Sequence, residues 1–548
     1  MKIYRLTSFA ILVVMLLSLM VACSQDKEPT ATSIPPTATQ QPPEPTELPT
    51  STNPDDQEER DQQQGQSNLT IEEYTQAIET DPQNADAYFE RGNAYEERGD
   101  YDQAIADYDQ VIVLNPQPIN AYVNRGNAYN NRGEAYGEQD DFDQAISDYD
   151  QAIALDPQDA RVYVNRGLAY INKGDLDRAI ADYDQAIALD PQLAGAYQSR
   201  GNVYYVKGDY DQALADLNQA IALDPQFAQA YNGRGNVYDE QGNPDLARAD
   251  YDQAIALDPQ YALAYYNRGV TCLRQDNLNC ALADYDQAIA LDPQYADAYA
   301  GRGFIYDSMG DLDRAISDYD QAIVLNPQLA HVYNSRGLAY LNQGNLNRAI
   351  ADYDQAIALD PQYAEAYYNR GLAYRYKDDF DQALTDYDQA IALDPQLILA
   401  YNNRGNIYFY QGDFDRALAD YGQVIALDPQ HADAHVNRGN VYLSQDDFDR
   451  AIADYDQAII LNPHLTAAYL QRGYACALSG QFEQALADLN EFIESNDSEA
   501  FAYYLRGAVY DALGDREKAI PDLEKALELG LDPEREQSVQ ALLEEWGH

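Results

Sequence analysis

Positively charged residues are scarce in this sequence. Its 548 residues include 35 Lys and Arg against 92 Asp and Glu, which gives a formal net charge of −57. The phosphates of nucleic acids and the headgroups of anionic lipids repel a chain this acidic. The charge therefore argues against nucleic-acid binding and electrostatic docking on a membrane, and it favours solubility and basic or cationic partners.

Cysteine is also rare, with four residues in the chain. The sequence contains an internal repeat, which is described below. Cys272 and Cys476 occupy a repeat position at which most copies have tyrosine, so we expect both in the core. Cys280 follows Cys272 by eight residues and is expected to face outward. An exported chain could oxidise this pair, and the sequence leaves open whether a disulfide forms.

The sequence lacks the motifs of common active sites. It has no glycine-rich phosphate loop, no nucleophile elbow and no complete calcium loop. His431 and His435 have a spacing at which one helix can present two imidazoles to a metal, but no third ligand is evident. We predict no catalytic residue, no metal site and no cofactor. An enzymatic function is a minor alternative. Substrate turnover by the purified fragment 69–548 would support it.

A hydrophobic run occurs near the N-terminus, from Phe9 to Ala22, behind Lys2 and Arg5. It is too short to span a bilayer and is typical of a secretory signal. Its end, Met20-Val21-Ala22-Cys23, resembles the lipobox of bacterial lipoproteins. The resemblance implies that Cys23 is acylated and becomes the new N-terminus. An ordinary cleaved signal is the alternative.

Residues 24–68 form a polar segment with eight prolines and seven threonines. It has too few apolar residues to fold and is expected to act as a tether. We therefore predict an exported chain, lipid-anchored to the outer face of a bacterial membrane. Ser24 leaves open which membrane carries the anchor.

The main feature of the sequence is an internal repeat. Thirteen Arg-Gly pairs recur at intervals of 34 residues, with a single step of 41. In the frame that starts at Ala85, positions 8 and 20 are small, positions 4, 11 and 24 are mostly tyrosine, and position 32 is mostly proline. Apolar residues recur every three or four residues on both sides of Gly99, which predicts two amphipathic helices joined by a tight turn. A fixed period of this length indicates a stacked array.

This pattern resembles the tetratricopeptide repeat (TPR) over residues 85–533. The resemblance implies an all-α, right-handed superhelical solenoid of about 13 TPR helix-turn-helix units with capping helices. Leu542, Leu543 and Trp546 are expected to cover its last face. The predicted organisation is a signal peptide (1–22), a lipidated cysteine and linker (23–68), a capping half-repeat (69–84), the solenoid (85–532) and a capping helix (533–548).

Two further patterns predict structure. Position 7 is Arg and position 23 is Asp in all thirteen repeats, so we hypothesise that each Arg pairs with an Asp of its own or a neighbouring repeat. The second repeat contains a seven-residue duplication, Asn131 to Gly137. Seven residues are nearly two helical turns, so its first helix should lengthen by about 10.5 Å and form a protruding helix pair over 120–155.

The TPR resemblance also predicts a binding site. In that family, positions 2, 5, 6, 9, 12 and 13 of the first helices face a concave groove. Asparagines at positions 6 and 9 partly resemble the peptide-gripping ladder of O-linked N-acetylglucosamine transferase; the alternative is that duplication spread them and they are only solvated. Position 6 has Asn124, Asn165, Asn267, Asn369, Asn403 and Asn437, and position 9 has Asn93, Asn127, Asn202, Asn236, Asn406 and Asn440. The aromatic and basic candidates are Tyr205, Phe304, Arg375, Tyr376, Phe409 and Tyr410.

We therefore expect a scaffold that binds proteins or peptides through this groove, with contacts between repeats 7 and 10. Nucleic acid is not expected as a partner, and membrane contact is expected through the lipid anchor only. The main alternative is a structural subunit of an envelope assembly or secretion complex, and a polyanionic cation buffer is a further one. The partner's identity and the oligomeric state are left open.

Overall fold

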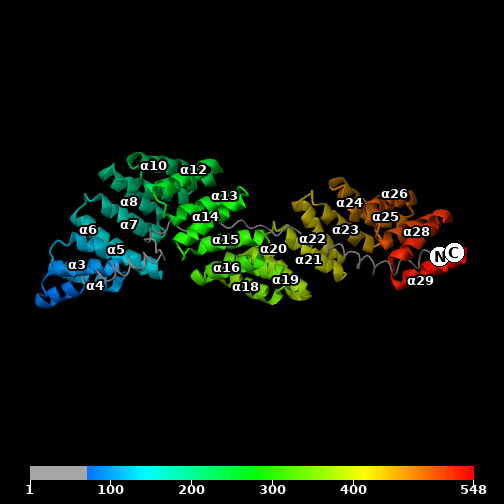
Figure 1. The fold of residues 1–548 in the computed structure, drawn as a ribbon, viewed down its shortest axis with the longest axis horizontal. Coiled ribbons are helices and arrows are strands. Elements are labelled where there is room, and N and C mark those ends of the chain that lie inside the picture. The colour runs from blue at the N-terminus through cyan, green and yellow to red at the C-terminus, as the bar shows by residue number, and fades with distance from the viewer. Residues whose placement is uncertain (1–70) are drawn as a thin grey trace. The chain divides into compact units, whose positions relative to one another are not determined.

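The computed structural model describes residues 71–548, and the predicted signal peptide, Cys23 and the linker lie outside these residues. The described part is all-α, with 28 helices and no strand between residues 71 and 548. This confirms the predicted fold class (Figure 1). The helices form two compact units, 71–327 and 328–548, each of which is described by itself. None of the helices over this range has the length and apolar character that a membrane span needs.

Each repeat folds into a hairpin of two antiparallel helices. The N-terminal unit begins with a helix over 71–80 and continues with α3 Ala85–Glu97, α4 Tyr101–Leu114, α5 Ile119–Tyr136, α6 Gln139–Leu155, α7 Ala160–Asn172, α8 Leu176–Leu189, α9 Ala194–Val206, α10 Tyr210–Leu223, α11 Ala228–Glu240, α12 Pro244–Leu257, α13 Ala262–Arg274, α14 Leu278–Leu291, α15 Ala296–Ser308 and α16 Leu312–Leu325. The C-terminal unit contains α17 Ala330–Asn342, α18 Leu346–Leu359, α19 Ala364–Tyr376, α20 Phe380–Leu393, α21 Ile398–Tyr410, α22 Phe414–Leu427, α23 Ala432–Ser444, α24 Phe448–Leu461, α25 Thr466–Ser479, α26 Phe482–Ser495, α27 Ala500–Ala512, α28 Arg516–Leu529 and α29 Pro533–Trp546.

The ends of the helices follow from local backbone chemistry. Position 15 adopts a left-handed conformation between the two helices, as at Gly99 with φ 79°. Aspartate takes this conformation in three hairpins, at Asp276, Asp378 and Asp446, with φ of 57°, 59° and 59°. The second helix ends before the repeat proline because the proline ring disfavours helical geometry in the preceding residue; Asp156, for example, has φ −135° and ψ 91°.

The recurring Arg-Gly pair packs against an Asp-Tyr pair of the same hairpin. In the first hairpin, Nε and Nη2 of Arg91 donate to the carboxylate of Asp107 at 2.8 and 2.7 Å. A Cβ atom at Gly92 would lie 2.7 Å from the ring of Tyr108, so glycine is needed for the ring to fit. The same two-pronged ion pair occurs in all thirteen hairpins, which confirms the predicted Arg–Asp pairing.

The seven-residue duplication extends both helices of the second hairpin. Helix α5 has 18 residues and α6 has 17, whereas the first hairpin has 13 and 14. The expectation that the first helix takes up the whole insertion is therefore wrong. The added turn has an ion pair of its own, in which Arg132 binds Asp141 at 2.8 and 2.7 Å. Gly133 also faces the ring of Phe142, so sharing the insertion between the helices lets the packing motif form twice.

Both ends of the described array are covered by helices. The helix over 71–80 has Ile71 and Ile78 buried, as expected for a capping half-repeat. Helix α29, Pro533–Trp546, lies within the predicted terminal segment 533–548 and begins at its first residue. Its Leu543 is 6% exposed, and Leu542 and Trp546 pack against the same cluster, which confirms their predicted role.

Candidate binding face of the first helices

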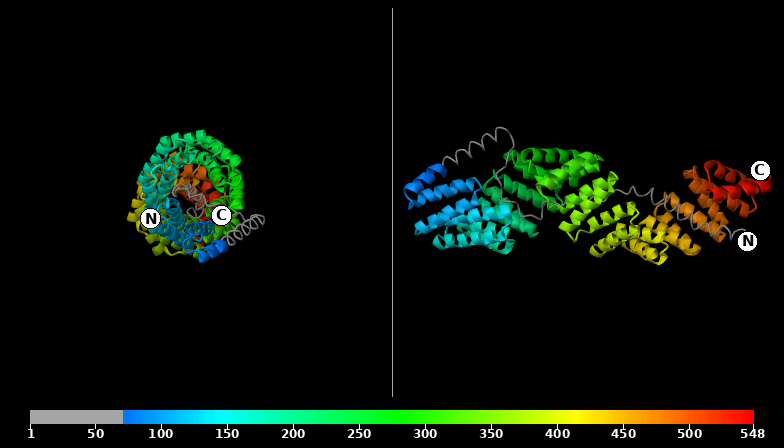
Figure 2. Two further views of the ribbon diagram at one scale, coloured as in Figure 1. Left: turned by 90° about the vertical axis from the view of Figure 1, so that its left-hand side faces the viewer. Right: turned by 90° about the horizontal axis from the view of Figure 1, so that it is seen from below.

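The first helices of neighbouring hairpins contact one another within each unit. Helix α9 contacts α11, and α17 contacts α19, whereas second helices contact mainly the first helices before and after them in the chain. Figure 2 shows the hairpins of each unit stacked side by side in sequence order. An array bends toward the side on which its helices lie closer, so the first helices line the inner side of each unit. We call the side of the first helices that carries positions 6, 9 and 12 the inner face.

Asparagines at position 9 bind the buried tyrosine of their own hairpin. The hydroxyl of Tyr251 donates to Oδ1 of Asn236 at 2.8 Å, and that of Tyr421 donates to Asn406 at 2.8 Å. Both tyrosines are 1% exposed, and burial raises the pKa of each well above its usual range. These amides thus supply the partner that a buried hydroxyl requires. The same bond joins Tyr108, Tyr149 and Tyr455 to Asn93, Asn127 and Asn440.

Asparagines at position 6 donate to the preceding hairpin. Nδ2 of Asn267 donates to Oδ1 of Asn232 at 3.1 Å and to Oδ1 of Asn236 at 3.0 Å. Nδ2 of Asn403 donates to the hydroxyl of Tyr368 at 3.0 Å. Asn124, Asn165, Asn369 and Asn437 donate in the same way to Asn93, Asn127, Asn334 and Asn402. These amides join neighbouring first helices. They are therefore structural contacts, and neither peptide binding alone nor solvation alone accounts for them.

Three of the position-9 asparagines, Asn127, Asn236 and Asn406, retain an unused donor group. Oδ1 accepts two hydrogen bonds at Asn127 and at Asn236, and one at Asn406. Nδ2 of these three half-buried residues makes no hydrogen bond within residues 71–548. Asn202 lacks the tyrosine partner because its hairpin has Leu217 at position 24. The inner face therefore presents N–H donors, while the matching oxygens are used inside the array.

Phe409 is not available on the inner face. It is 4% exposed, and its ring centroid lies 5.8 Å from that of Tyr410 and 6.0 Å from that of Phe414. Phe414 begins α22 and covers this ring from the second helix. The expectation of an exposed aromatic at residue 409 is therefore wrong, whereas Tyr410 is half-buried.

The other predicted aromatic and basic residues reach the surface to different extents. Tyr376 is 46% exposed, and the guanidinium carbon of Arg375 lies 5.3 Å from its ring centroid. Tyr205 is half-buried at 6.1 Å from Tyr210, and Phe304 is half-buried on α15. These residues belong to separate hairpins, and Tyr205 and Phe304 lie in the N-terminal unit.

Sequence analysis did not single out the carboxylates at position 12 in the N-terminal unit. The Glu96 carboxylate shares the single hydroxyl proton of Tyr108 with Asn93 and lies 2.8 Å from that hydroxyl, and burial raises the pKa of Glu96. Asp239 accepts one from Nη1 of Arg274 at 2.6 Å, and burial raises its pKa as well. Burial raises the pKa of Asp307 to about 6. The only sequence signal was an acid at an inner-face position, which is hard to notice among 92 acidic residues.

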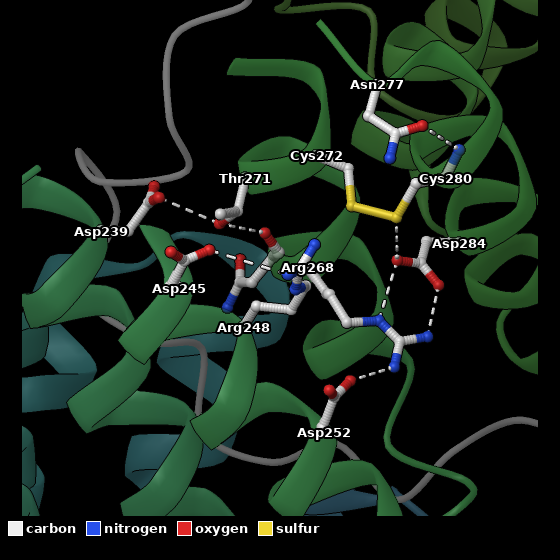
Figure 3. The surroundings of a disulfide bond; sticks show 11 residues. Asp239, Asp245, Arg248, Asp252, Arg268, Thr271, Cys272, Asn277, Cys280 and Asp284 are labelled. Atoms are coloured by element: carbon white, nitrogen blue, oxygen red, sulfur yellow. Dashed lines mark hydrogen bonds and ion pairs between the residues drawn. A yellow bond between two sulfur atoms is a disulfide. The ribbon is translucent and has the colours of Figure 1, made fainter. Parts of the chain in front are cut away.

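Cys272 and Cys280 form a disulfide between α13 and α14, with their Cα atoms 5.8 Å apart (Figure 3). Cys272 is fully buried and Cys280 is half-buried, so the expectation that Cys280 faces outward holds only in part. Asp284 lies beside Cys280, and its carboxylate is held by Arg268 at 2.9 and 2.6 Å. The two sulfurs and this carboxylate are metal-ligand types, but no thiolate is available while the disulfide is intact.

The two histidines of the possible metal pair have structural contacts. Nδ1 of His431 accepts a hydrogen bond from the backbone N–H of Ala434 at 3.2 Å and caps α23. Nδ1 of His435 lies 3.2 Å from the carboxylate of Asp454 in a buried pair. Both residues are thus engaged within their own hairpin.

Family models of the tetratricopeptide repeat match this chain along most of its length. The matched residues are 130–194 and 402–466, then 62–98, 201–242, 272–310, 305–344 and 339–377, then 85–118, 228–261 and 364–397, and finally 439–502 and 500–530. The chain belongs to the tetratricopeptide repeat family. TPR arrays are generally non-catalytic scaffolds, and this TPR chain is a scaffold suited to protein–protein interaction.

Several solved structures are similar to this TPR chain. The Cut9–Hcn1 hetero-tetramer of APC/C is 17% identical over 76% of this chain and 94% of the other, with a TM-score of 0.40. MamA is 32% identical over 30% of this chain and 96% of its own, with a TM-score of 0.27. YrrB, a TPR protein with an unusual peptide-binding site, is 26% identical over 34% and 95%, with a TM-score of 0.30. No curated protein matches the chain.

Proposed function

We propose that this TPR chain is an exported, lipid-anchored scaffold that binds extended polypeptide segments along the inner face of its first helices. One observation carries the binding part of the proposal. In five hairpins a buried tyrosine holds the oxygen of the position-9 asparagine, as Tyr421 holds Asn406 at 2.8 Å, so the amide group has a fixed orientation. The same arrangement recurs at Asn127 and Asn236.

These amide donors suit the backbone of an extended peptide. A peptide presents a carbonyl oxygen at every residue, and an asparagine N–H can donate to it whatever the side chain is. Because the asparagine is already held by its tyrosine, little side-chain entropy is lost on binding. Such donors therefore favour sequence-tolerant binding, with specificity left to the other residues of the inner face.

The anchoring part of the proposal rests on the sequence. The apolar run, the lipobox-like Met20-Val21-Ala22-Cys23 and the proline-rich tether are the features that support it. A Cys23→Ser variant should lose incorporation of a fatty-acid label and move from the membrane fraction to the soluble exported fraction. Export with unchanged membrane retention and no labelled lipid on the wild-type chain would contradict the anchor.

Crosslinking in the native cells tests the binding face. The full chain is captured, and its crosslinked proteins are identified by mass spectrometry. The test variant carries Asn236→Asp and Asn406→Asp, which keep an oxygen for the tyrosine hydroxyls but replace the N–H donors. The control carries Asn218→Asp and Asn490→Asp, whose side chains accept from Arg234 and Arg506 at 2.6 and 2.7 Å. Asn218 and Asn490 both occupy position 25 of the repeat, where most other repeats have Asp. The control therefore adds the same charge as the test variant, but away from the inner face.

Partners lost in the test variant and kept in the control would support binding on the inner face. Partners that persist in both variants would contradict it and favour the structural-subunit alternative, with contacts on other surfaces. Thermal melting of both variants checks that neither change unfolds the array.

A further inference from the structure

We propose that α15 carries a subsite for a basic side chain of the bound polypeptide, formed by the ring of Phe304 and the carboxylate of Asp307. This inference rests on the proposed function and adds the chemistry of the partner. It names a Lys or Arg side chain as the group that this part of the inner face recognises.

The two residues are placed together by the helix. Phe304 and Asp307 occupy positions 9 and 12 of α15, three residues apart, so both lie on the same side of the helix. Both are half-buried. The Asp307 carboxylate accepts no hydrogen bond and meets no cation within residues 71–548. A charged group in this setting gains more from an incoming cation than one in open water.

The same array already fills an equivalent place with arginine. Asp239 occupies position 12 of α11, two hairpins before Asp307, and accepts from Nη1 of Arg274 at 2.6 Å. Arginines also lie over aromatic rings, as Arg314 does over Tyr306 at 4.3 Å. Asp307 has the carboxylate and an adjacent ring without the arginine. The Asp239–Arg274 contact thus indicates that a guanidinium group suits a carboxylate at position 12.

Position 9 carries no asparagine in hairpins 6 to 9, and α15 lies within this stretch. The hydroxyl of Tyr285 is fully buried and has no hydrogen-bond partner among residues 71–548, because Val270 stands at position 9 of its hairpin and Gly301 at position 6 of the next. A Cβ atom at Gly301 would lie 3.2 Å from this hydroxyl oxygen, so the hydroxyl lies directly beneath α15 at the inner face. Amide donors are therefore absent here, and an aromatic ring and a carboxylate follow on the same helix. At α15 the inner face thus offers groups that attract a cation in place of amide donors that bind a peptide carbonyl.

Charge complementarity identifies the occupant. The chain has a net charge of −57, so it attracts basic peptides from a distance. Aromatic rings and carboxylates both attract ammonium and guanidinium groups, and the ring adds a contact that an exposed carboxylate alone does not make. A Lys or Arg of an extended peptide is thus favoured over an acidic or neutral residue at this place.

Peptide selection on the full chain tests the proposal. Random twelve-residue peptides are selected on the wild type, on Asp307→Asn and on Asp511→Asn. Asp511 is the matched control because it is half-buried at position 12 of α27, in the C-terminal unit, and its change removes the same charge. We expect one peptide position enriched at least about tenfold in Lys or Arg on the wild type and on Asp511→Asn, and not on Asp307→Asn.

A selected arginine peptide and its citrulline analogue give the second measurement. Citrulline keeps the shape of arginine without its charge, so the Kd for the wild type should rise at least about tenfold, while Asp307→Asn should bind both peptides alike. Equal losses in Asp307→Asn and Asp511→Asn would overturn the subsite and leave only long-range charge attraction. Recovery of no peptide by the wild type would contradict the proposed function itself, whereas recovery without a basic preference would contradict only this inference.

Discussion

Removing one hydroxyl group should have opposite effects in two hairpins. Tyr421 and Tyr285 occupy the same repeat position and are 1% and 0% exposed. The Tyr421 hydroxyl donates to Asn406 at 2.8 Å, whereas the Tyr285 hydroxyl has no hydrogen-bond partner in the part of the chain that the structure describes. Tyr421→Phe should destabilise its hairpin by about 1 kcal/mol, the net value of one hydrogen bond. Tyr285→Phe should stabilise its hairpin by about 1 kcal/mol, because it removes a buried polar group that is not satisfied.

Amide hydrogen exchange followed by mass spectrometry is the suitable assay, because a long repeat array need not unfold in one step. A change of about 1 kcal/mol alters the local opening equilibrium about fivefold. Exchange should become faster in α21 and α22 for Tyr421→Phe, and slower in α13 and α14 for Tyr285→Phe. Changing Asn406 to Val together with Tyr421→Phe should recover most of the loss, since both polar partners are then gone. Effects of the same sign in both hairpins would refute the role assigned to the asparagines.

Three further changes test other parts of the structure. Arg404→Leu should cost about 3–5 kcal/mol by leaving the buried Asp420 carboxylate unpaired, while a double change to Leu at both residues should cost much less, as measured by urea melting. Asp446→Gly should raise the melting temperature, by relieving about 1 kcal/mol of left-handed strain at φ 59°. Because the folded-state pKa of Asp307 is about 6, above the usual 3.8, the folded protein binds this proton more tightly and loses stability as pH rises from about 4 to 6. Calorimetry should therefore find Asp307→Asn more stable than the wild type above pH 6 and equally stable below pH 4. The difference above pH 6 should be at most about 3 kcal/mol before solvent screening is taken into account.

The hairpin fold could be predicted because its requirements are local. A fixed spacing of small, aromatic and proline residues indicates where two helices approach, turn and end, and α29 begins at the predicted residue Pro533. The Arg–Asp pairing was also predictable, because both columns are fully occupied in every repeat. Pattern alone did not decide which Asp would be the two-pronged partner, which depends on the distance across the folded hairpin.

The binding face was less predictable because exposure depends on neighbours from other helices. Phe409 and Arg375 both occupy position 12, yet Phe409 is buried because the ring of Phe414 packs against it. The asparagine spacing predicted a row on one side of the first helices, but a spacing cannot show that Oδ1 of Asn236 already accepts from Tyr251. The shared extension of α5 and α6 was missed for a related reason, since a second Gly–aromatic contact forms only when both helices lengthen.

The interruption of the asparagine ladder links the stability of the array to its surface chemistry. An asparagine at position 9 satisfies the buried tyrosine and offers one donor, so keeping it in every repeat would favour both stability and uniform backbone binding. Val270 stands at position 9 instead, as other residues do in six further repeats, and the Tyr285 hydroxyl has no hydrogen-bond partner within residues 71–548. On the first helix of the next hairpin, α15, Asp307 is half-buried and meets no cation among the described residues. Both features lower stability, and they occur within α13 to α15. Residue choices that lower the stability of a fold are expected at sites that serve binding. We therefore expect the array to distinguish one partner from another along this stretch of the inner face.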